Sequence, residues 1–161
     1  MLLILINTNY EDALSHLLRD LGDENALAIT NDAIITWKSR ASVERGLMSL
    51  KEKIISKVSG EGDVEFSYAL IELSDDQLGN LRTMIRDALV RLDRETYRHI
   101  DSIRNRLDRI SEKRLETEMK FLNKRFNSLM LLHNKFKVMT PDTEKMIDLM
   151  RELRIMLGKK R

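Results

Sequence analysis

The chain has 161 residues, of which 42% are hydrophobic and 34% charged, a composition typical of a folded, soluble protein rather than a disordered one. It contains no cysteine, which excludes disulfides, thiolate metal sites and cysteine nucleophiles and agrees with a reducing cytoplasm. The net charge of +2 conceals an asymmetry: residues 1–97 hold 11 Lys and Arg against 17 Asp and Glu, and residues 98–161 hold 17 against 9. This pattern permits head-to-tail association or nucleic-acid contact by the basic half, and a well-solvated helix surface explains it equally.

The first part of the chain mixes β-rich and helical segments. Leu2–Ile6 is an apolar strand, too short and without the basic flank of a signal peptide or a membrane span. Asn7-Thr-Asn9 offers N-cap residues for a helix over Tyr10–Leu21, and Gly22 ends that helix. Ala26–Thr30 and Ala33–Trp37 are short β-rich runs on either side of Asn31-Asp32, so we expect a hairpin there.

A longer helix and a further β-rich run follow. Apolar residues at alternating steps of three and four predict a helix over Ser39–Ser59. The sequence Gly60-Glu-Gly-Asp63 predicts a linker, and Val64–Leu73 is either a fourth strand or an extended connector. Residues 1–72 are therefore predicted to form a small α+β module.

Long helices dominate the rest of the chain. Ser74-Asp-Asp-Gln77 is a capping box, and no glycine or proline occurs from Asn80 to Thr140. The apolar stripe slips between Ile110 and Leu115, which are five residues apart, so we favour a turn between two antiparallel helices near 111–113 over one stuttering helix.

The final helix has clear start and stop signals. Thr140-Pro141 opens it, with Asp142 and Glu144 in its first turn, and Gly158 is expected to end it. The predicted fold class is mostly α: the α+β module is followed, over residues 73–161, by an all-helical domain with long antiparallel helices.

Sequence motifs for catalysis and metal binding are nearly absent. No P-loop, GxGxxG, GxSxG or HExxH occurs, and His16, His99 and His133 lack a second ligand at metal spacing, so we predict no metal, no cofactor and no enzyme activity. One pattern offers an alternative. Arg94 and His99 match the Arg-x4-His arrangement and so resemble the HEPN ribonucleases, in which these residues are implied to promote attack by the RNA 2′-hydroxyl.

The helical half offers two kinds of candidate surface. Basic side chains there suit non-specific phosphate contact, as in a nucleic-acid-binding coiled-coil protein, but no aromatic residues interleave with them to stack on bases. The cationic candidates are Arg104, Arg109, Lys120, Lys124 and Arg125. The apolar stripe is the second candidate and predicts an interface formed by Leu107, Ile110, Leu115, Met119, Leu122, Phe126 and Leu129, buried against a partner or against the last helix.

The helical half also resembles a known family. The capped start at Leu73–Gln77, Arg125-Phe-Asn127 followed by Leu129-Met130, and a Thr-Pro opening of a last helix that ends in Met150–Arg154 and Leu157-Gly158 are similar to the helical domain of archaeal GINS subunits. The similarity covers residues 74–158. It implies a DNA replication subunit that oligomerises through helices and joins a replicative helicase to its partners.

These observations together predict a cytoplasmic, non-catalytic assembly or scaffold subunit. Its expected partners are proteins, in a homo- or hetero-oligomer, with a replicative helicase as the partner that the resemblance implies. Non-specific nucleic-acid binding is an open alternative, and no membrane association is expected.

Overall fold

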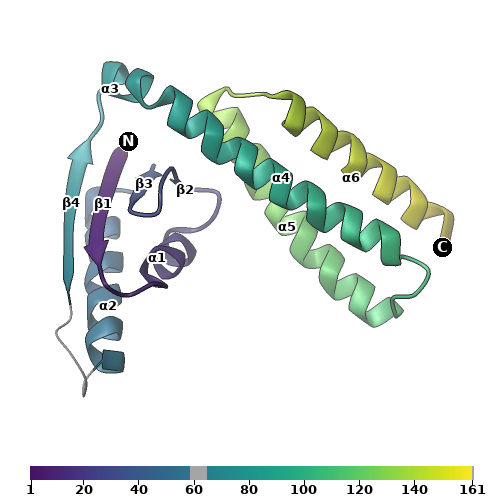
Figure 1. Cartoon of the computed structure of the whole chain (residues 1–161), viewed down its shortest axis with the longest axis horizontal. Helices are drawn as coiled ribbons and strands as arrows, with labels where there is room; N and C mark the ends of the chain where they lie inside the picture. The colour runs from purple at the N-terminus through teal and green to yellow at the C-terminus, as the bar shows by residue number, and fades with distance from the viewer. Residues whose placement is uncertain (59–64, 161) are drawn as a thin grey trace. The chain divides into compact units, whose positions relative to one another are not determined.

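The computed structural model describes residues 1–58 and 65–160, over which the chain forms six helices and one four-stranded antiparallel sheet (Figure 1). The chain divides into two compact units, Met1–Ala88 and Leu89–Arg161. The predicted fold class is confirmed: the protein is mostly α, with a small α+β module followed by helices. The predicted linker at 60–63 lies outside the described residues.

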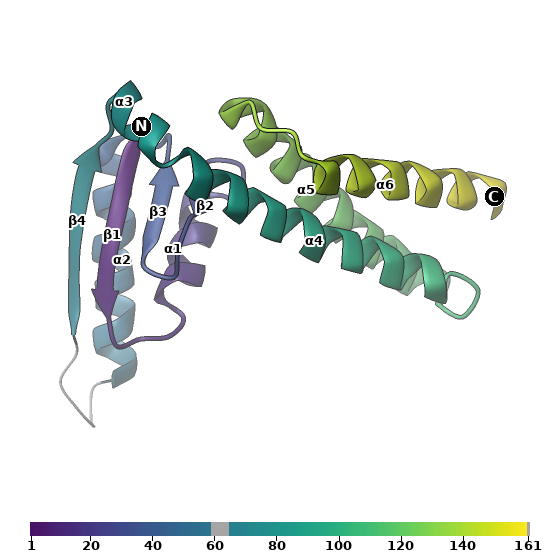
Figure 2. The same cartoon turned by 45° about the horizontal axis from the view of Figure 1, so that its top comes forward.

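The α+β module alternates strands and helices in a β-α-β-β-α-β order. Its strands form the sheet β2-β3-β1-β4 with every neighbouring pair antiparallel (Figure 2), which is the split βαβ arrangement of ferredoxin-like folds. The elements are β1 (Leu2–Thr8), α1 (Ala13–Leu21), β2 (Ala26–Ala28), β3 (Ala33–Thr36), α2 (Arg40–Val58) and β4 (Phe66–Glu72).

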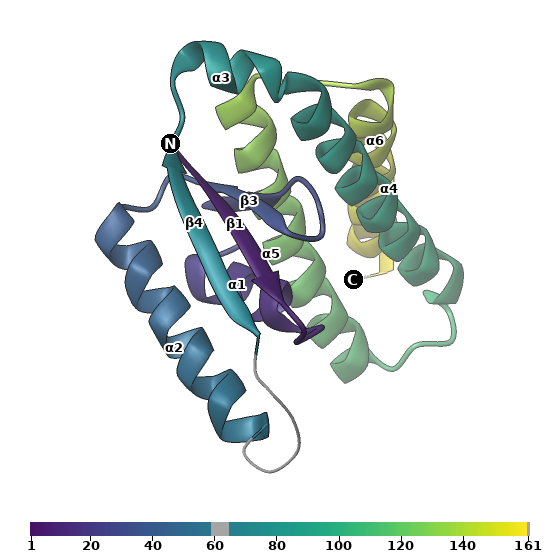
Figure 3. The ribbon, with the colours of Figure 1, turned by 60° about the vertical axis from the view of Figure 1, so that its left-hand side comes forward.

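Strand alternation explains why the two helices pack on one face of this sheet (Figure 3). Successive strand side chains point to opposite faces, and Leu2, Ile4 and Ile6 of β1 are buried in one cluster with residues of α1 and α2. Leu17 of α1 and Leu47 of α2 are completely buried in that cluster. The apolar side chains of β1, α1 and α2 therefore all lie in one layer between the sheet and the two helices.

The module departs from the sequence predictions at several boundaries. β1 continues through Thr8, so the predicted cap at Asn7–Asn9 was wrong, and α1 begins after Asp12, whose side chain makes no capping hydrogen bond. The hairpin of β2 and β3 is confirmed. β4 is a strand paired with β1 along its whole length rather than an extended connector.

The capping box is confirmed in full. The Ser74 hydroxyl accepts a hydrogen bond from the Gln77 N–H, and the Gln77 side chain accepts one from the Ser74 N–H. This capping box opens only a short helix, α3 (Asp75–Asn80). The helix is interrupted at Leu81, and α4 (Arg82–Arg106) begins after it. The stretch between the capping box and the predicted turn near 111–113 therefore holds two helices, α3 and α4.

The predicted helical hairpin is confirmed, with the turn slightly earlier than expected. α4 ends at Arg106 and α5 (Glu112–Phe136) begins after Ser111. The last helix, α6 (Pro141–Lys160), opens at Thr140 as predicted but runs through Gly158, so the predicted stop at Gly158 was wrong. A helix tolerates one glycine at a cost of about 1 kcal/mol relative to alanine.

The second unit is a three-helix bundle of α4 from Leu89 onward, α5 and α6. Ion pairs define the directions of its helices: Arg106–Glu118 at 2.9 Å and Arg125–Glu95 at 2.8 Å require α4 and α5 to be antiparallel. The Arg104–Glu152 pair at 3.1 Å and the Thr143–Asp93 hydrogen bond require α6 to run alongside α4 in the same direction. Its buried core includes Ile100, Ile103, Leu122, Phe126, Met146 and Leu153.

Candidate functional site

One end of the bundle contains a buried polar cluster, here called the locked end, made of Asp93, His133, Thr140 and Thr143. His133 Nε2 lies 2.7 Å from Asp93 Oδ1, and the Thr143 hydroxyl donates to Asp93 Oδ2 at 2.7 Å. His133 Nδ1 lies 2.8 Å from the Val138 carbonyl oxygen. The side chains of Asp93 and His133 have no exposed surface, so the cluster joins all three helices inside the bundle.

The hydrogen bonds of His133 define where its protons lie. A carbonyl oxygen can only accept, so Nδ1 carries a proton and donates it to Val138. Nε2 faces a carboxylate oxygen, and two opposed lone pairs at 2.7 Å would repel each other. A further proton therefore lies between His133 and Asp93, and the buried pair as a whole is neutral.

The cluster contains the residue types of a nucleophilic triad but not its geometry. In such a triad the hydroxyl is hydrogen-bonded to the histidine, which removes its proton. Here the Thr143 hydroxyl donates to Asp93 instead, and it shares a 3.0 Å contact with Thr140 at the start of α6. Asp93, His133 and Thr143 are all buried, so the arrangement is suited to fixing helix positions.

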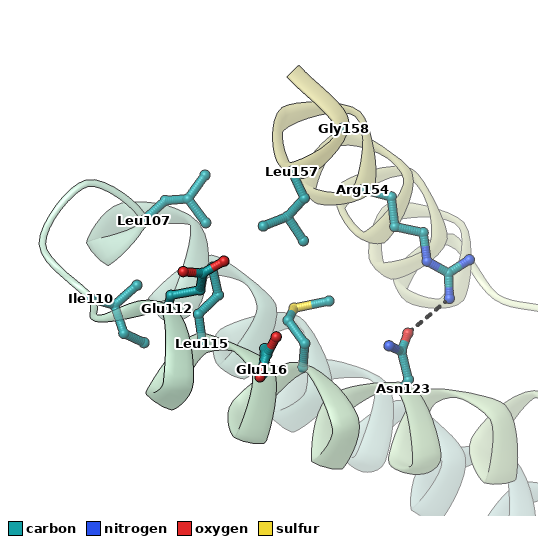
Figure 4. Close-up of a pocket in the computed structure, with 10 residues that line it drawn as sticks. Leu107, Ile110, Glu112, Leu115, Glu116, Asn123, Arg154, Leu157 and Gly158 are labelled. Atoms are coloured by element: carbon teal, nitrogen blue, oxygen red, sulfur yellow. Dashed lines mark hydrogen bonds between the residues drawn. The ribbon is translucent and has the colours of Figure 1, made fainter. Parts of the chain in front are cut away.

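The opposite end of the bundle holds a pocket of about 640 Å³, here called the open end (Figure 4). It lies beside the turn that follows α4, at the start of α5 and the end of α6, and residues of this turn, of α5 and of α6 form its wall. Its apolar lining comes from Leu107, Ile110, Leu115, Met119 and Leu157, and its polar lining from Glu112, Glu116, Asn123 and Arg154.

The polar groups of the open end differ in whether they make hydrogen bonds. Arg154 donates to the Asn123 side-chain oxygen at 3.1 Å, the contact drawn in Figure 4, and lies 5.6 Å from the centre of the Phe126 ring. Within the described part of the chain, no hydrogen bond or ion pair engages the carboxylates of Glu112 and Glu116. The pocket thus combines an apolar floor with two available acidic groups, which suits an apolar group flanked by a cation.

The seven residues predicted as an interface fall into two groups. Leu107, Ile110, Leu115 and Met119 line the pocket, although Leu107 is itself largely buried. The other three lie inside the bundle and need no second chain to cover them: Leu122, Phe126 and Leu129. Replacing Leu122 or Phe126 with a charged residue would therefore disrupt the fold before it reported on an interface.

Arg94 and His99 lie on different sides of α4. They are five residues apart, which corresponds to about 140° around a helix axis. Arg94 donates to both carboxylate oxygens of Asp142 at 3.2 and 3.3 Å, and this hydrogen bond raises the pKa of the guanidinium. His99 is half-buried, and no hydrogen bond joins it to Arg94 within the described residues.

The five cationic candidates do not form one uniform basic surface. Arg104 is hydrogen-bonded to Asp101 and Glu152, and Arg125 to Glu95, so acidic neighbours offset both charges. Arg109, Lys120 and Lys124 are exposed. Among the described residues, Arg109, Lys120 and Lys124 therefore present charge without a hydrogen-bonded acidic partner, whereas Arg104 and Arg125 do not.

Sequence reasoning missed the locked end, yet a signal for it exists. Asp93 and Thr96 fall between Leu89 and Ile100 at steps of four, three and four, so they occupy the apolar stripe of α4. His133 likewise lies four residues after Leu129 in the stripe of α5. A charged residue at a core position of a helix indicates a buried partner, and this pattern could have paired Asp93 with His133.

Among the described residues, no group of three or more His, Asp and Glu side chains could hold a metal ion. None of the helices, over the same part of the chain, is long and apolar enough to cross a membrane. Comparison with protein-family models, with curated proteins and with solved structures finds no match to this chain.

Proposed function

We propose that this protein is a non-catalytic assembly subunit that binds an apolar segment of a partner protein at the open end of its helical bundle. The observation that carries the proposal is the pocket lined by Leu107, Ile110, Leu115, Met119 and Leu157. A bundle gains stability by closing its core, yet Ile110, Leu115, Met119 and Leu157 remain only partly buried around this pocket. The same bundle is tightly closed at its locked end.

The charges of the open end specify the chemistry of the partner. Among the described residues that line the pocket, Glu112 and Glu116 outnumber the one cation, Arg154, whose guanidinium is hydrogen-bonded to Asn123. This balance complements a helix that carries Lys or Arg beside its apolar face. A basic amphipathic helix therefore fits the pocket better than an acidic one. A pocket of this size accepts a few anchoring side chains rather than a whole domain.

The resemblance of residues 74–158 to GINS subunits gives this proposal a narrower form, in which the partner belongs to a replicative helicase assembly. The motifs that support it lie in the helical half, the half that also holds the open end. Co-elution of the purified chain with the replicative helicase of its own source tests this form. Separate elution of the two proteins at micromolar concentration would leave the general proposal standing and remove the narrower one.

A paired-variant capture experiment tests the general proposal. Tagged wild-type chain and the variant Met119→Glu would each be incubated with extract, and the captured proteins quantified by mass spectrometry. Met119 is half-buried at the pocket, so a charge there should block an apolar ligand while leaving the buried core intact. We expect at least one protein with a basic amphipathic helix to be retained by the wild type and lost, by about tenfold or more, with the variant.

The matched control is Phe121→Glu, which places the same charge on α5 at a side chain that is 73% exposed and does not line the pocket. It should capture the same proteins as the wild type. Identical capture by all three chains, with unchanged circular dichroism and thermal midpoint, would contradict binding at the open end.

A further inference from the structure

The two edges of the sheet differ in a way that bears on self-association. One edge is β2, which has three residues, and the other is β4, which has seven and pairs with β1 without a bulge from Phe66 to Glu72. Natural edge strands are usually short, bulged, or protected by Lys or Pro. β4 has none of these features, and Tyr68 and Ile71 are 43% and 38% exposed on it.

The ladder with β1 defines which backbone groups of β4 point outward. The Leu73 N–H donates to the Met1 carbonyl oxygen at 2.9 Å, so Met1 and Leu73 form a hydrogen-bonded pair. Hydrogen-bonded pairs alternate along antiparallel strands, so Ser67, Ala69 and Ile71 bond to β1. The N–H and C=O groups of residues 66, 68, 70 and 72 therefore point away from the sheet.

These outward groups are almost entirely available. The Leu70 carbonyl oxygen accepts one long hydrogen bond, at 3.4 Å, from the exposed guanidinium of Arg40. Within the described residues, no other hydrogen bond engages the outward backbone groups of Phe66, Tyr68 or Glu72. An exposed row of alternating donors and acceptors is a template for another strand.

We propose that a second copy of this chain pairs with β4, antiparallel, about a two-fold axis at Ala69. This register places Tyr68 opposite Leu70 of the partner subunit and Phe66 opposite Glu72 of the partner subunit, so every outward group of β4 is hydrogen-bonded. Ala69 then faces its own copy in a non-hydrogen-bonded pair, where Cα atoms approach to about 4.5 Å and a small side chain fits.

The charge pattern favours a second copy in this orientation. Glu72 is the one charged residue of β4, and antiparallel pairing separates the two carboxylates to opposite ends of the joined strands. Parallel pairing would place them side by side, which is unfavourable. A two-fold pairing is also closed, and it leaves only the three-residue β2 at each outer edge of the combined sheet.

Solution mass and a backbone-specific variant test this inference. Sedimentation equilibrium of the full chain should give a dimer, twice the 18.9 kDa of one chain. Tyr68→Pro removes an outward N–H without touching the ladder to β1, and we expect it to raise the dimer dissociation constant by at least about tenfold. Tyr68→Val keeps the N–H and should remain a dimer.

A second variant and a second measurement keep the test decisive if Tyr68→Pro fails to fold. Tyr68→Lys keeps the backbone and adds the charge that natural edges use against pairing, so it should also weaken the dimer. In hydrogen exchange on the wild type, the amides of Tyr68 and Leu70 should become more protected as protein concentration rises. A monomeric wild type, a folded Tyr68→Lys or Tyr68→Pro that stays fully dimeric, or concentration-independent exchange of these amides would each overturn the proposal.

This pairing is independent of the open end. Met119→Glu should leave the dimer unchanged, and Tyr68→Pro should leave capture at the pocket unchanged. Failure of one proposal is thus distinguishable from failure of the other.

Discussion

The two ends of the helical bundle differ in how their side chains are packed. At the locked end, Asp93, His133 and Thr143 are buried, and His133 and Thr143 are both hydrogen-bonded to Asp93. At the open end, the apolar side chains of Ile110, Leu115 and Met119 remain only partly buried around a pocket. A satisfied polar cluster therefore fixes the helix register at one end, while the other end keeps apolar side chains partly exposed around a pocket.

The largest effect is expected at the locked end, from Asp93→Ala. The substitution removes the acceptor for both His133 and Thr143 and leaves their polar atoms buried without a partner, so we expect a loss of about 3–5 kcal/mol in unfolding free energy. Urea denaturation followed by circular dichroism measures it.

Asp142→Ala is the control for the loss of a nearby carboxylate, since Asp142 is only half-buried. It breaks the surface pair with Arg94 at 3.2 Å and should change stability far less. Equal losses for Asp93→Ala and Asp142→Ala would mean that the buried cluster is not the anchor of this end.

A Leu→Ala substitution at two positions on α5 compares the stability contributed by the core with that contributed by the pocket lining. Leu122 has no exposed surface, so Leu122→Ala should cost about 3 kcal/mol through lost burial and a new cavity. Leu115 is half-buried at the open end, and Leu115→Ala should cost less than about 1 kcal/mol while weakening partner capture. A loss at Leu115 as large as that at Leu122 would show that the open end is part of the stabilising core.

Local sequence signals predicted the elements of the fold far better than they predicted the site. The starts of two helices could be predicted from the capping residues Ser74 and Thr140. The helical hairpin could be predicted from the apolar stripe, which shifts register after Ile110. The ferredoxin-like strand order was out of reach, because it depends on β3 inserting between β1 and β2, which no local pattern encodes. The hydrogen bonds of the locked end join Asp93 to His133, 40 positions away in the sequence, and to Thr143, 50 positions away. Such contacts form only when the helices pack together.

The same Thr→Val substitution at two positions tests whether hydrogen bonds account for the stability of the locked end. Thr143→Val removes a hydroxyl that donates to Asp93 and accepts from the Thr140 N–H, so we expect a loss of about 1–2 kcal/mol. Thr96 is equally buried on α4, but its hydroxyl has no partner within the described structure. Thr96→Val should therefore leave stability unchanged or raise it.

Thermal and urea unfolding of both valine variants measure the contrast. Thr143→Ser keeps the hydroxyl and serves as the control, with a loss smaller than that of Thr143→Val. If both valine variants lost the same stability, the cause would be packing around threonine rather than the hydrogen bonds.

The smallest effect is expected from Glu118→Gln, beside the turn that leads into the open end. Glu118 pairs with Arg106 of α4 at 2.9 Å and with Arg114 of α5 at 3.0 Å. Partial burial acts to raise the pKa of Glu118, but hydrogen bonds from Arg114 and Arg106 outweigh it and lower that pKa. A lowered pKa means that the stabilisation is present above the ordinary carboxyl range and is lost as pH falls through the folded-state pKa.

Glu118→Gln should therefore cost about 0.5 kcal/mol at pH 7, a value typical of solvent-screened ion pairs near a protein surface. The difference from wild type should shrink toward zero on acidification, because both chains then carry an uncharged group at this position. Glu116→Gln is the control, since Glu116 has no ion-pair partner among the described residues and should change little at any pH. A Glu118→Gln loss that persists unchanged at about pH 3 would assign the stabilisation to packing instead of charge, and the α4–α5 turn would then be fixed by the same kind of contact as the core.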